Sequence, residues 1–396
     1  MGKPRRPLPI PSNCPPLSRQ ATEVLRSRAL STAMDVVAMA QVGGGPIQWR
    51  VWSREGDLII YQGEDPSGPH NVCPMMGWME IPGSLDEVAD LFRTDTLQHA
   101  AEYTQRFCPD VDAVLTLYTI AQLKKLNDDM ISVTWRASKS GSSPFALKRD
   151  MCLLECHHAF QLENNRRGRV CAVESIDMPC CPDFQAEHGY IRTQVVSSGH
   201  VFVESRLKSG YLELSYVVRG DLSTASSLGR WLAVKAMAKR CRSIKAIDAW
   251  LRQNRVNRTP FLPVAKVVPH RSRRQCHLCR KVFHALTRKT TCFKCGEVLC
   301  SPCTTPQRVE IDGKKRRLDV CTSCCIRPPE IKDVGLIETT AVTEQGSDDG
   351  GWLRQRPRRA YSAYVTRNDF EIQARPSLPL LSAGEVVRSP IYILGQ

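Results

Sequence analysis

The sequence predicts an α+β chain, in which a strongly twisted antiparallel sheet closed by a long C-terminal helix precedes a small module with two zinc ions. Three observations support this fold class. Segments between residues 45 and 221 alternate apolar and polar side chains, as half-buried strands do. Residues 227–254 carry apolar side chains at helical spacing. Four Cys-x-x-Cys pairs lie within residues 276–324.

The composition predicts a folded chain with a disordered segment at each terminus. Hydrophobic residues make up 42% of the 396 positions, and no apolar run is long enough to span a bilayer. The basic, Pro-rich start MGKPRRPLPIPSN lacks the apolar core of a signal peptide, so we expect a cytoplasmic protein. Residues 1–20, with six prolines, and residues 329–396, rich in Pro, Ser and Gly, are expected to be disordered.

Residues 21–258 are expected to form the larger domain. An amphipathic helix is predicted over 18–39, and two strands follow in 45–64 around a Ser-Arg-Glu-Gly-Asp turn. Ser84 and Glu87 have the spacing of a capping box, which predicts the start of another helix. Further strands are predicted in 130–138, 149–160, 167–176, 188–206 and 209–221.

The helix predicted over 227–254 closes this domain. Its apolar positions follow steps of three and four, which predicts one buried face and a Lys/Arg face in solvent. They are Trp231, Val234, Met237, Cys241, Ile244, Ile247 and Leu251. Such a helix over a concave sheet either leaves an apolar cavity or completes a solid core. No Ser/His/Asp or Cys/His set can be assembled in this region, and adjacent His157 and His158 would point to opposite faces of a strand, so we expect no enzyme.

Three stretches of this domain form a recognisable set: LKRDMCLLE (147–155), SIDMPCCPDFQAEHGYIRTQVVSSGHVFVE (175–204) and YLELSYVVRGDLSTA (211–225). Together they resemble the START family of lipid-transfer domains. The resemblance implies a helix-grip fold, in which the sheet wraps around the final helix and encloses an apolar cavity for a lipid. The family's tryptophan-centred motif is replaced by EYTQRFCPDVDAV (102–114).

The cysteines are concentrated in one segment. Nine of the eighteen lie between Cys276 and Cys325, and clustered cysteines in a reducing compartment indicate metal rather than disulfides. Only four residues separate the second and third Cys-x-x-Cys pairs, so we expect crossed ligation, first with third and second with fourth. The predicted ligands are Cys276, Cys279, Cys300 and Cys303 for one zinc, and Cys292, Cys295, Cys321 and Cys324 for the other. Four thiolates leave no open position, so both sites are structural, and Cys325 is expected to be a free thiol.

The same segment holds most of the positive charge. Residues 266–327 contain fifteen Lys or Arg and four Asp or Glu, a net charge of +11 out of +15 for the whole chain. This charge predicts an anionic partner. Nucleic acid is not expected, because the segment has neither a Cys2His2 helix nor aromatic residues among its basic runs.

Residues 264–328 resemble the FYVE zinc finger, a membrane-targeting module that recognises phosphatidylinositol 3-phosphate on endosomes. The cysteine spacing carries the resemblance, and Phe283 stands at the family's core aromatic position. Leu286 falls on the loop that inserts into the membrane, between Ala285 and Thr287. The resemblance implies that Arg288, Lys289 and Lys294 bind the lipid head group.

The motifs that read the phosphate in this family are altered. Thr290, Thr291 and Phe293 replace two histidines and an arginine, and Asp319 replaces the arginine of an Arg-Val-Cys motif. An Asp in place of an Arg removes one phosphate contact and adds repulsion. The family's Trp-x-x-Asp is absent before Cys276, and weaker charge-driven binding to anionic membrane is expected to remain.

Two functions are compatible with these features. The first is a peripheral membrane adaptor that holds a lipid in the larger domain and docks on anionic endosomal membrane through the finger. The second is an interaction scaffold, in which the finger and the preceding helix bind a protein partner such as a small GTPase. A RING-type ubiquitin ligase also uses eight crossed ligands, but His277 and His284 lie off the Cys-x-x-Cys register.

Overall fold

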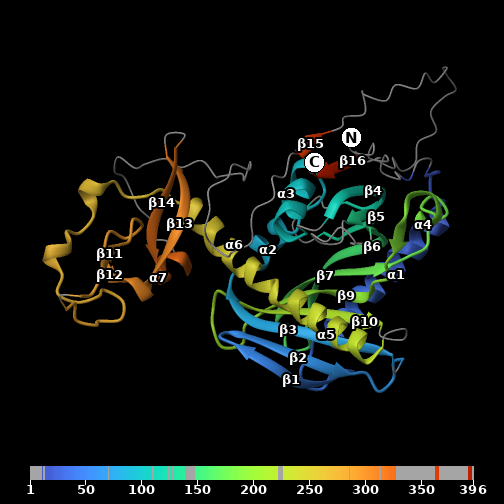
Figure 1. Cartoon of the computed structure of the whole chain (residues 1–396), viewed down its shortest axis with the longest axis horizontal. Helices are drawn as coiled ribbons and strands as arrows, with labels where there is room; N and C mark the ends of the chain where they lie inside the picture. Colours follow the sequence, from blue (N-terminus) through green and yellow to red (C-terminus); the bar gives the residue numbers. More distant parts are fainter. Residues whose placement is uncertain are drawn as a thin grey trace. The chain divides into compact units, whose positions relative to one another are not determined.

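The computed structural model divides the chain into two compact units, Met1–Ile244 with Gly346–Gln396, and Lys245–Gln345 (Figure 1). The structure describes residues 11, 14–69, 71–108, 111–122, 125, 128–138, 148–221, 226–284, 286–311, 314–326, 362–364 and 391–394. Most of the segments expected to be disordered, 1–20 and 329–396, lie outside these residues. In the described part of the chain, no helix combines the length and apolar character needed to cross a bilayer.

The first unit is built on one large sheet. Its strand order is β1-β2-β3-β10-β9-β7-β6-β5-β4-β16-β15, and the short β8 pairs in parallel with β6, whereas the other pairs are antiparallel. The strands are β1 (Gln48–Glu55), β2 (Leu58–Glu64), β3 (Val72–Pro82), β4 (Val111–Ala121), β5 (Met130–Ser138), β6 (Lys148–Gln161), β7 (Arg167–Ser175), β8 (Tyr190–Arg192), β9 (Val196–Glu204), β10 (Tyr211–Asp221), β15 (Ser362–Tyr364) and β16 (Ile391–Leu394). The last two lie in the expected disordered tail and differ from that expectation. The predicted α+β class is confirmed.

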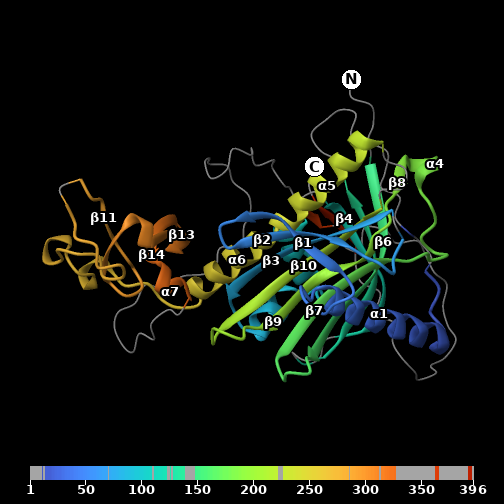
Figure 2. The ribbon, with the colours of Figure 1, turned by 90° about the horizontal axis from the view of Figure 1, so that it is seen from below.

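Helices cover both faces of this sheet (Figures 1 and 2). Helix α1 (Arg19–Met39) starts at Ser18, whose Oγ accepts a hydrogen bond from the Ala21 N–H, and buries its small apolar residues on β6, β7 and β9. Helix α5 (Ser227–Arg242) crosses β3 and β10. A Cβ at Gly77 would lie 2.7 Å from the Cys241 carbonyl oxygen, so a glycine is needed where α5 approaches β3.

Two further helices contribute an aromatic layer on the α5 side of the sheet. Helix α2 (Leu85–Leu91) has the predicted capping box, with Ser84 and Glu87 each bonding the other's backbone N–H, and α3 (Leu97–Phe107) follows. The Phe92 ring contacts His200 at a centroid distance of 5.4 Å, and His200 stacks on Tyr216 at 4.2 Å. Burial lowers the pKa of His200 to about 3, so this imidazole is neutral at physiological pH.

The sequence did not predict α3, β3 or β4. Strand β3 has the sequence VCPMMGWMEIP and is buried on both faces along most of its length, so it lacks the alternation that reveals a half-buried strand. The short helix α4 (Gln185–His188) was also unpredicted.

The helix predicted over 227–254 is two helices, which corrects the prediction. Helix α5 ends at Arg242 and α6 (Ile244–Asn257) begins after Ser243. Both the Ser243 N–H and its hydroxyl donate to the Arg240 carbonyl, and this three-residue spacing tightens the turn and ends α5.

The burial pattern of these two helices follows the prediction at five of its seven apolar positions, and Val234 is only half-buried. Met237, Cys241, Ile244, Ile247 and Leu251 are buried as predicted. Trp231 is instead 56% exposed. The first unit reaches Ile244, whereas the larger domain was predicted over residues 21–258.

The second unit contains α6 and a small β-rich finger. Its elements are η1 (Val264–Lys266), η2 (His270–Ser272), β11 (Lys289–Thr291), β12 (Val298–Cys300), η3 (Ser301–Cys303), β13 (Thr304–Ile311), β14 (Lys314–Cys321) and α7 (Thr322–Ile326). Strand β11 pairs with β12 and β13 pairs with β14, both antiparallel. Strand β14 ends at Cys321, the first cysteine of the fourth Cys-x-x-Cys.

Candidate metal centres

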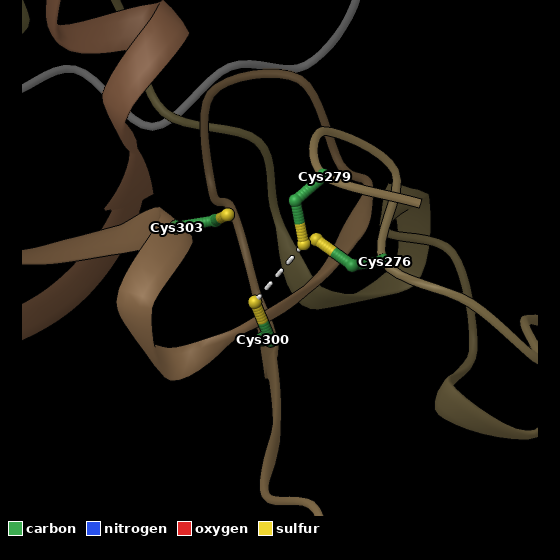
Figure 3. A group of neighbouring side chains, drawn as sticks. All are labelled: Cys276, Cys279, Cys300 and Cys303. Atoms are coloured by element: carbon green, nitrogen blue, oxygen red, sulfur yellow. Dashed lines mark hydrogen bonds between the residues drawn. The ribbon is translucent and has the colours of Figure 1, made fainter. Parts of the chain in front are cut away.

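The first and third Cys-x-x-Cys pairs meet in one tetrad, formed by Cys276, Cys279, Cys300 and Cys303 (Figure 3). Cys276 and Cys279 lie in a turn closed by the hydrogen bond from the Arg280 N–H to the Cys276 carbonyl. Cys300 ends β12 and Cys303 ends η3. The four sulfurs lie within 4.8 Å of one another, and those of Cys279 and Cys300 are 3.6 Å apart.

The second and fourth pairs form the other tetrad, from Cys292, Cys295, Cys321 and Cys324, whose sulfurs also lie within 4.8 Å of one another. Backbone N–H groups point at these sulfurs. The N–H groups of Lys294 and Cys321 lie 3.4 and 3.2 Å from Cys292 Sγ, and that of Cys324 lies 3.3 Å from Cys321 Sγ. Such donors stabilise thiolates, the form of cysteine that binds zinc.

The two tetrads have the donor set and dimensions of closed zinc sites. A Zn–S bond of about 2.3 Å in a tetrahedron places sulfurs about 3.8 Å apart, close to the 3.6 Å between Cys279 and Cys300. Each tetrad supplies four thiols, so each can hold one Zn²⁺ with no position left for a substrate. Two zinc ions as the cofactors agree with the prediction.

Cys325 lies beside the second tetrad but is not a member of it. Its side chain is buried, and Gln307 Nε2 donates a hydrogen bond to its sulfur at 3.7 Å. Burial raises the pKa of the Cys325 thiol to about 11, so it is a neutral core residue.

The core of the finger extends backward into α6 and the connection that follows it. Val256 and Phe261 are fully buried and pack with the cysteines, Leu299, Val309 and Val320 in one cluster. The Arg255 guanidinium donates to the Ile326 carbonyl, and the Leu262 N–H donates to the Phe293 carbonyl. The core of the finger, predicted over 264–328, therefore also includes Val256 and Phe261 from the preceding residues.

Lys294 belongs to this core, which corrects its prediction as a head-group ligand. Its side chain is 0% exposed, and its ammonium donates to the carbonyl oxygens of Thr259 and Pro260 and to the Thr259 hydroxyl. The same ammonium lies 3.5 Å from the centre of the Phe261 ring. A lipid phosphate cannot reach this group, and its role is to join the α6 connection to the second tetrad.

Replacing Lys294 by Met should therefore weaken the finger. The substitution keeps the apolar stem but leaves the carbonyls of the half-buried Thr259 and Pro260 without this donor, at a cost of roughly 2 kcal/mol. Zinc release to a chromogenic chelator in increasing urea measures the effect, with the exposed Lys281→Met as the control. Unchanged zinc retention together with weaker vesicle binding would restore the head-group role.

The other predicted lipid contacts lie on the surface of the finger. Leu286 is fully exposed, and the Arg288 side chain two positions later is exposed as well. Lys289 is partly engaged, because its ammonium donates to the carbonyls of His270 and Arg273 at 2.9 Å each and lies 5.0 Å from the Phe283 ring centre. Ala285 lies outside the described residues.

The fold also brings η2 beside β11, which the sequence did not predict. His270 Nε2 and Thr291 Oγ1 are 2.7 Å apart, so an imidazole from the segment before Cys276 lies against the strand in which threonines replace histidines. Arg273 forms an ion pair with Glu297 at 2.8 Å. Only the presence of a histidine in PHRSRRQC could have suggested this arrangement.

Residues 266–328 match the FYVE zinc finger family. This match covers the eight tetrad cysteines and the exposed Leu286, and it begins at Lys266, the last residue of η1. No curated protein matches the chain.

Several solved structures are similar to the larger part of the chain. Human StAR-related lipid transfer protein 5 is 14% identical, with 57% of this chain and 94% of that chain covered and a TM-score of 0.41. A STAR-related lipid transfer protein fragment from Xanthomonas axonopodis is 15% identical, with coverage of 52% and 99% and a TM-score of 0.36. Human STARD10 is 15% identical, with coverage of 60% and 84% and a TM-score of 0.34.

Proposed function

We propose that this protein is a peripheral membrane adaptor whose zinc-stabilised FYVE finger docks on anionic phospholipid membrane, endosomal membrane in particular. The two zinc ions are held by the two cysteine tetrads, and they keep the finger folded. The observation that carries the proposal is Leu286, a fully exposed apolar side chain in a strongly basic module. An isolated apolar side chain at that position gains free energy by entering a bilayer.

Insertion of the leucine side chain and electrostatic attraction of the basic residues contribute comparable free energies to membrane binding. Transfer of a leucine side chain out of water is worth about 1.5–3 kcal/mol. Each Lys or Arg near an anionic surface adds about 1 kcal/mol, and salt weakens this term. Leu286 and Arg288 together supply both contributions at one place on the finger.

The altered pocket favours recognition of negative charge over reading of one phosphoinositide. Asp319 stands where the family has an arginine, and two of the three ammonium hydrogens of Lys289 are engaged by backbone carbonyls. Arg288 and His270 remain to meet a phosphate. Binding to phosphatidylserine and to phosphatidylinositol 3-phosphate is therefore expected to differ little at equal surface charge.

Leu286→Ser is expected to lower the affinity of the zinc-loaded full chain for phosphatidylserine vesicles about tenfold, from the lost leucine transfer energy. Arg288→Gln is expected to lower it about fivefold, an effect that disappears at high salt. Vesicle flotation measures both. The controls are Leu207→Ser and Arg206→Gln, which change exposed residues of the first unit.

If both finger variants float like the wild type, the membrane proposal is wrong. The interaction-scaffold function would then be the better account, because α6 packs on the finger and the two could present a joint surface to a protein partner. A lipid held by the larger unit stays a separate proposal. Its test is recovery of lipid from the purified full chain by mass spectrometry.

A further inference from the structure

The N-terminal half of α5 exposes large apolar side chains. Leu228, Trp231 and Leu232 are 67%, 56% and 52% exposed, although the opposite side of the same helix is buried on the sheet through Met237, Ala238 and Cys241. Leu228, Trp231, Leu232, Lys235 and Lys239 follow one another at steps of three and four, so they share one side of the helix. We name these five residues the α5 outer face.

All charged residues of helix α5 are cationic. Its sixteen residues include Arg230, Lys235, Lys239, Arg240 and Arg242, and no Asp or Glu. The α5 outer face therefore passes from three apolar side chains at its N-terminal end to two lysines further along. This is the composition of helices that lie in the membrane interface, with apolar residues and Trp on one side and Lys or Arg around them.

A second tryptophan extends the surface beyond the helix. The Lys235 ammonium lies 5.2 Å from the Trp52 ring centre on β1 and 5.4 Å from that of Trp231. Arg242 also lies over Trp52, at 5.7 Å, and forms an ion pair with Glu55 at 2.7 Å. These contacts bring the two indole rings and the two cations together beside the edge strand β1.

We propose that the α5 outer face, with Trp52, is a second membrane-docking surface that binds anionic phospholipid independently of the finger. Leucine and tryptophan side chains would enter the acyl boundary, and Lys235 and Lys239 would meet lipid phosphates. The proposal extends the proposed function, but it rests on residues of the first unit alone.

The chemistry favours a bilayer over other anionic partners. A nucleic acid would use the lysines and leave Leu228 and Leu232 in water. An acidic protein would need a matching apolar pocket among its carboxylates. An anionic bilayer accepts both kinds of side chain along one helix without any specific pairing.

Flotation of the zinc-loaded full chain on phosphatidylserine vesicles tests the proposal. The variants are L228S/W231S on α5, Leu286→Ser on the finger, and the combination, with Leu207→Ser as the exposed-leucine control. Two linked sites strengthen each other through effective concentration, so losing either is expected to weaken binding about 10-fold or more. The combination is expected to abolish it.

A second measurement does not require the double variant L228S/W231S to fold. Vesicles with brominated acyl chains quench tryptophans that enter the bilayer. Trp231→Leu keeps an apolar side chain, so binding should persist while quenching falls substantially.

The outcomes separate the two proposals. Wild-type flotation of L228S/W231S, or unchanged quenching in Trp231→Leu, would overturn the role of α5 and leave the finger untouched. Loss of binding from the α5 change with none from Leu286→Ser would support the α5 surface and overturn docking by the finger. Capture of an acidic protein with no vesicle binding would overturn both.

Discussion

Replacing Cys292 by Ser, or removing zinc with a strong chelator, is expected to unfold the finger and leave the large sheet folded. The finger has a small core in which the cysteines themselves are buried members, so without zinc little apolar surface remains to hold it. Structural zinc contributes on the order of 10 kcal/mol to modules of this kind, the largest single effect expected in this protein. Elemental analysis of bound zinc and hydrogen exchange over residues 289–300 measure the loss.

Cys325→Ser is the matched control for this prediction. Cys325 is buried like Cys292 and lies next to Cys324, but it is outside both tetrads. It should keep two zinc ions per chain with a small loss of stability. Two zinc ions retained by the Cys292→Ser chain, with unchanged hydrogen exchange, would contradict the tetrad assignment.

The second large effect is expected from Asp150, a carboxylate buried in the first unit. Asp150 is 0% exposed and accepts hydrogen bonds from Trp135 Nε1 at 2.9 Å and from Arg192 Nη2 at 2.8 Å. Asp150→Ala leaves the Trp135 indole N–H without this acceptor and leaves the Arg192 guanidinium with only the carbonyls of Cys181 and Pro182. Loss of one partner of a buried ion pair costs about 3–5 kcal/mol. Asp150→Asn should cost less, because it keeps an acceptor for Trp135.

Urea unfolding followed by tryptophan fluorescence measures this effect, because Trp135 lies in the ion-pair cluster itself. Glu204→Ala is the control, since its ion pair with Arg167 is exposed and is worth about 1 kcal/mol or less. A stability of Asp150→Ala within 1 kcal/mol of the wild type would contradict the account of a buried, charge-dependent pair.

Local sequence patterns predicted the parts of the structure that are themselves local. A Cys-x-x-Cys turn, a capping box and a strand with alternating burial depend on residues within a few positions of one another. The grouping of the cysteines into two tetrads could also be predicted from the short separation of the second and third pairs, because only four residues separate Cys295 from Cys300. Zinc count and crossed grouping could thus be predicted from spacing.

The features that the sequence missed depend on distant partners. Lys294 resembles any other basic residue in its segment, and only the fold brings it to Thr259 and Pro260 in a buried position. The helix break at Ser243 depends on two hydrogen bonds to the Arg240 carbonyl, which the spacing of apolar residues does not reveal.

Two stretches that carry the resemblance to lipid-transfer domains meet in the structure. Asp150 belongs to LKRDMCLLE and Arg192 to the stretch containing HGYIRTQ, and their ion pair joins β6 to the parallel strand β8. Each stretch was visible in the sequence, but the pairing required the fold.

The central claim is that the zinc-loaded finger carries this protein to anionic membrane. Flotation of the full chain on neutral, phosphatidylserine and phosphatidylinositol 3-phosphate vesicles of matched charge tests it most directly, at low and physiological salt, with zinc and after chelation. We expect binding to both anionic vesicles, weaker at physiological salt and lowered by chelation, with little preference for the 3-phosphate. Equal binding to neutral vesicles, or binding indifferent to zinc removal, would contradict the claim.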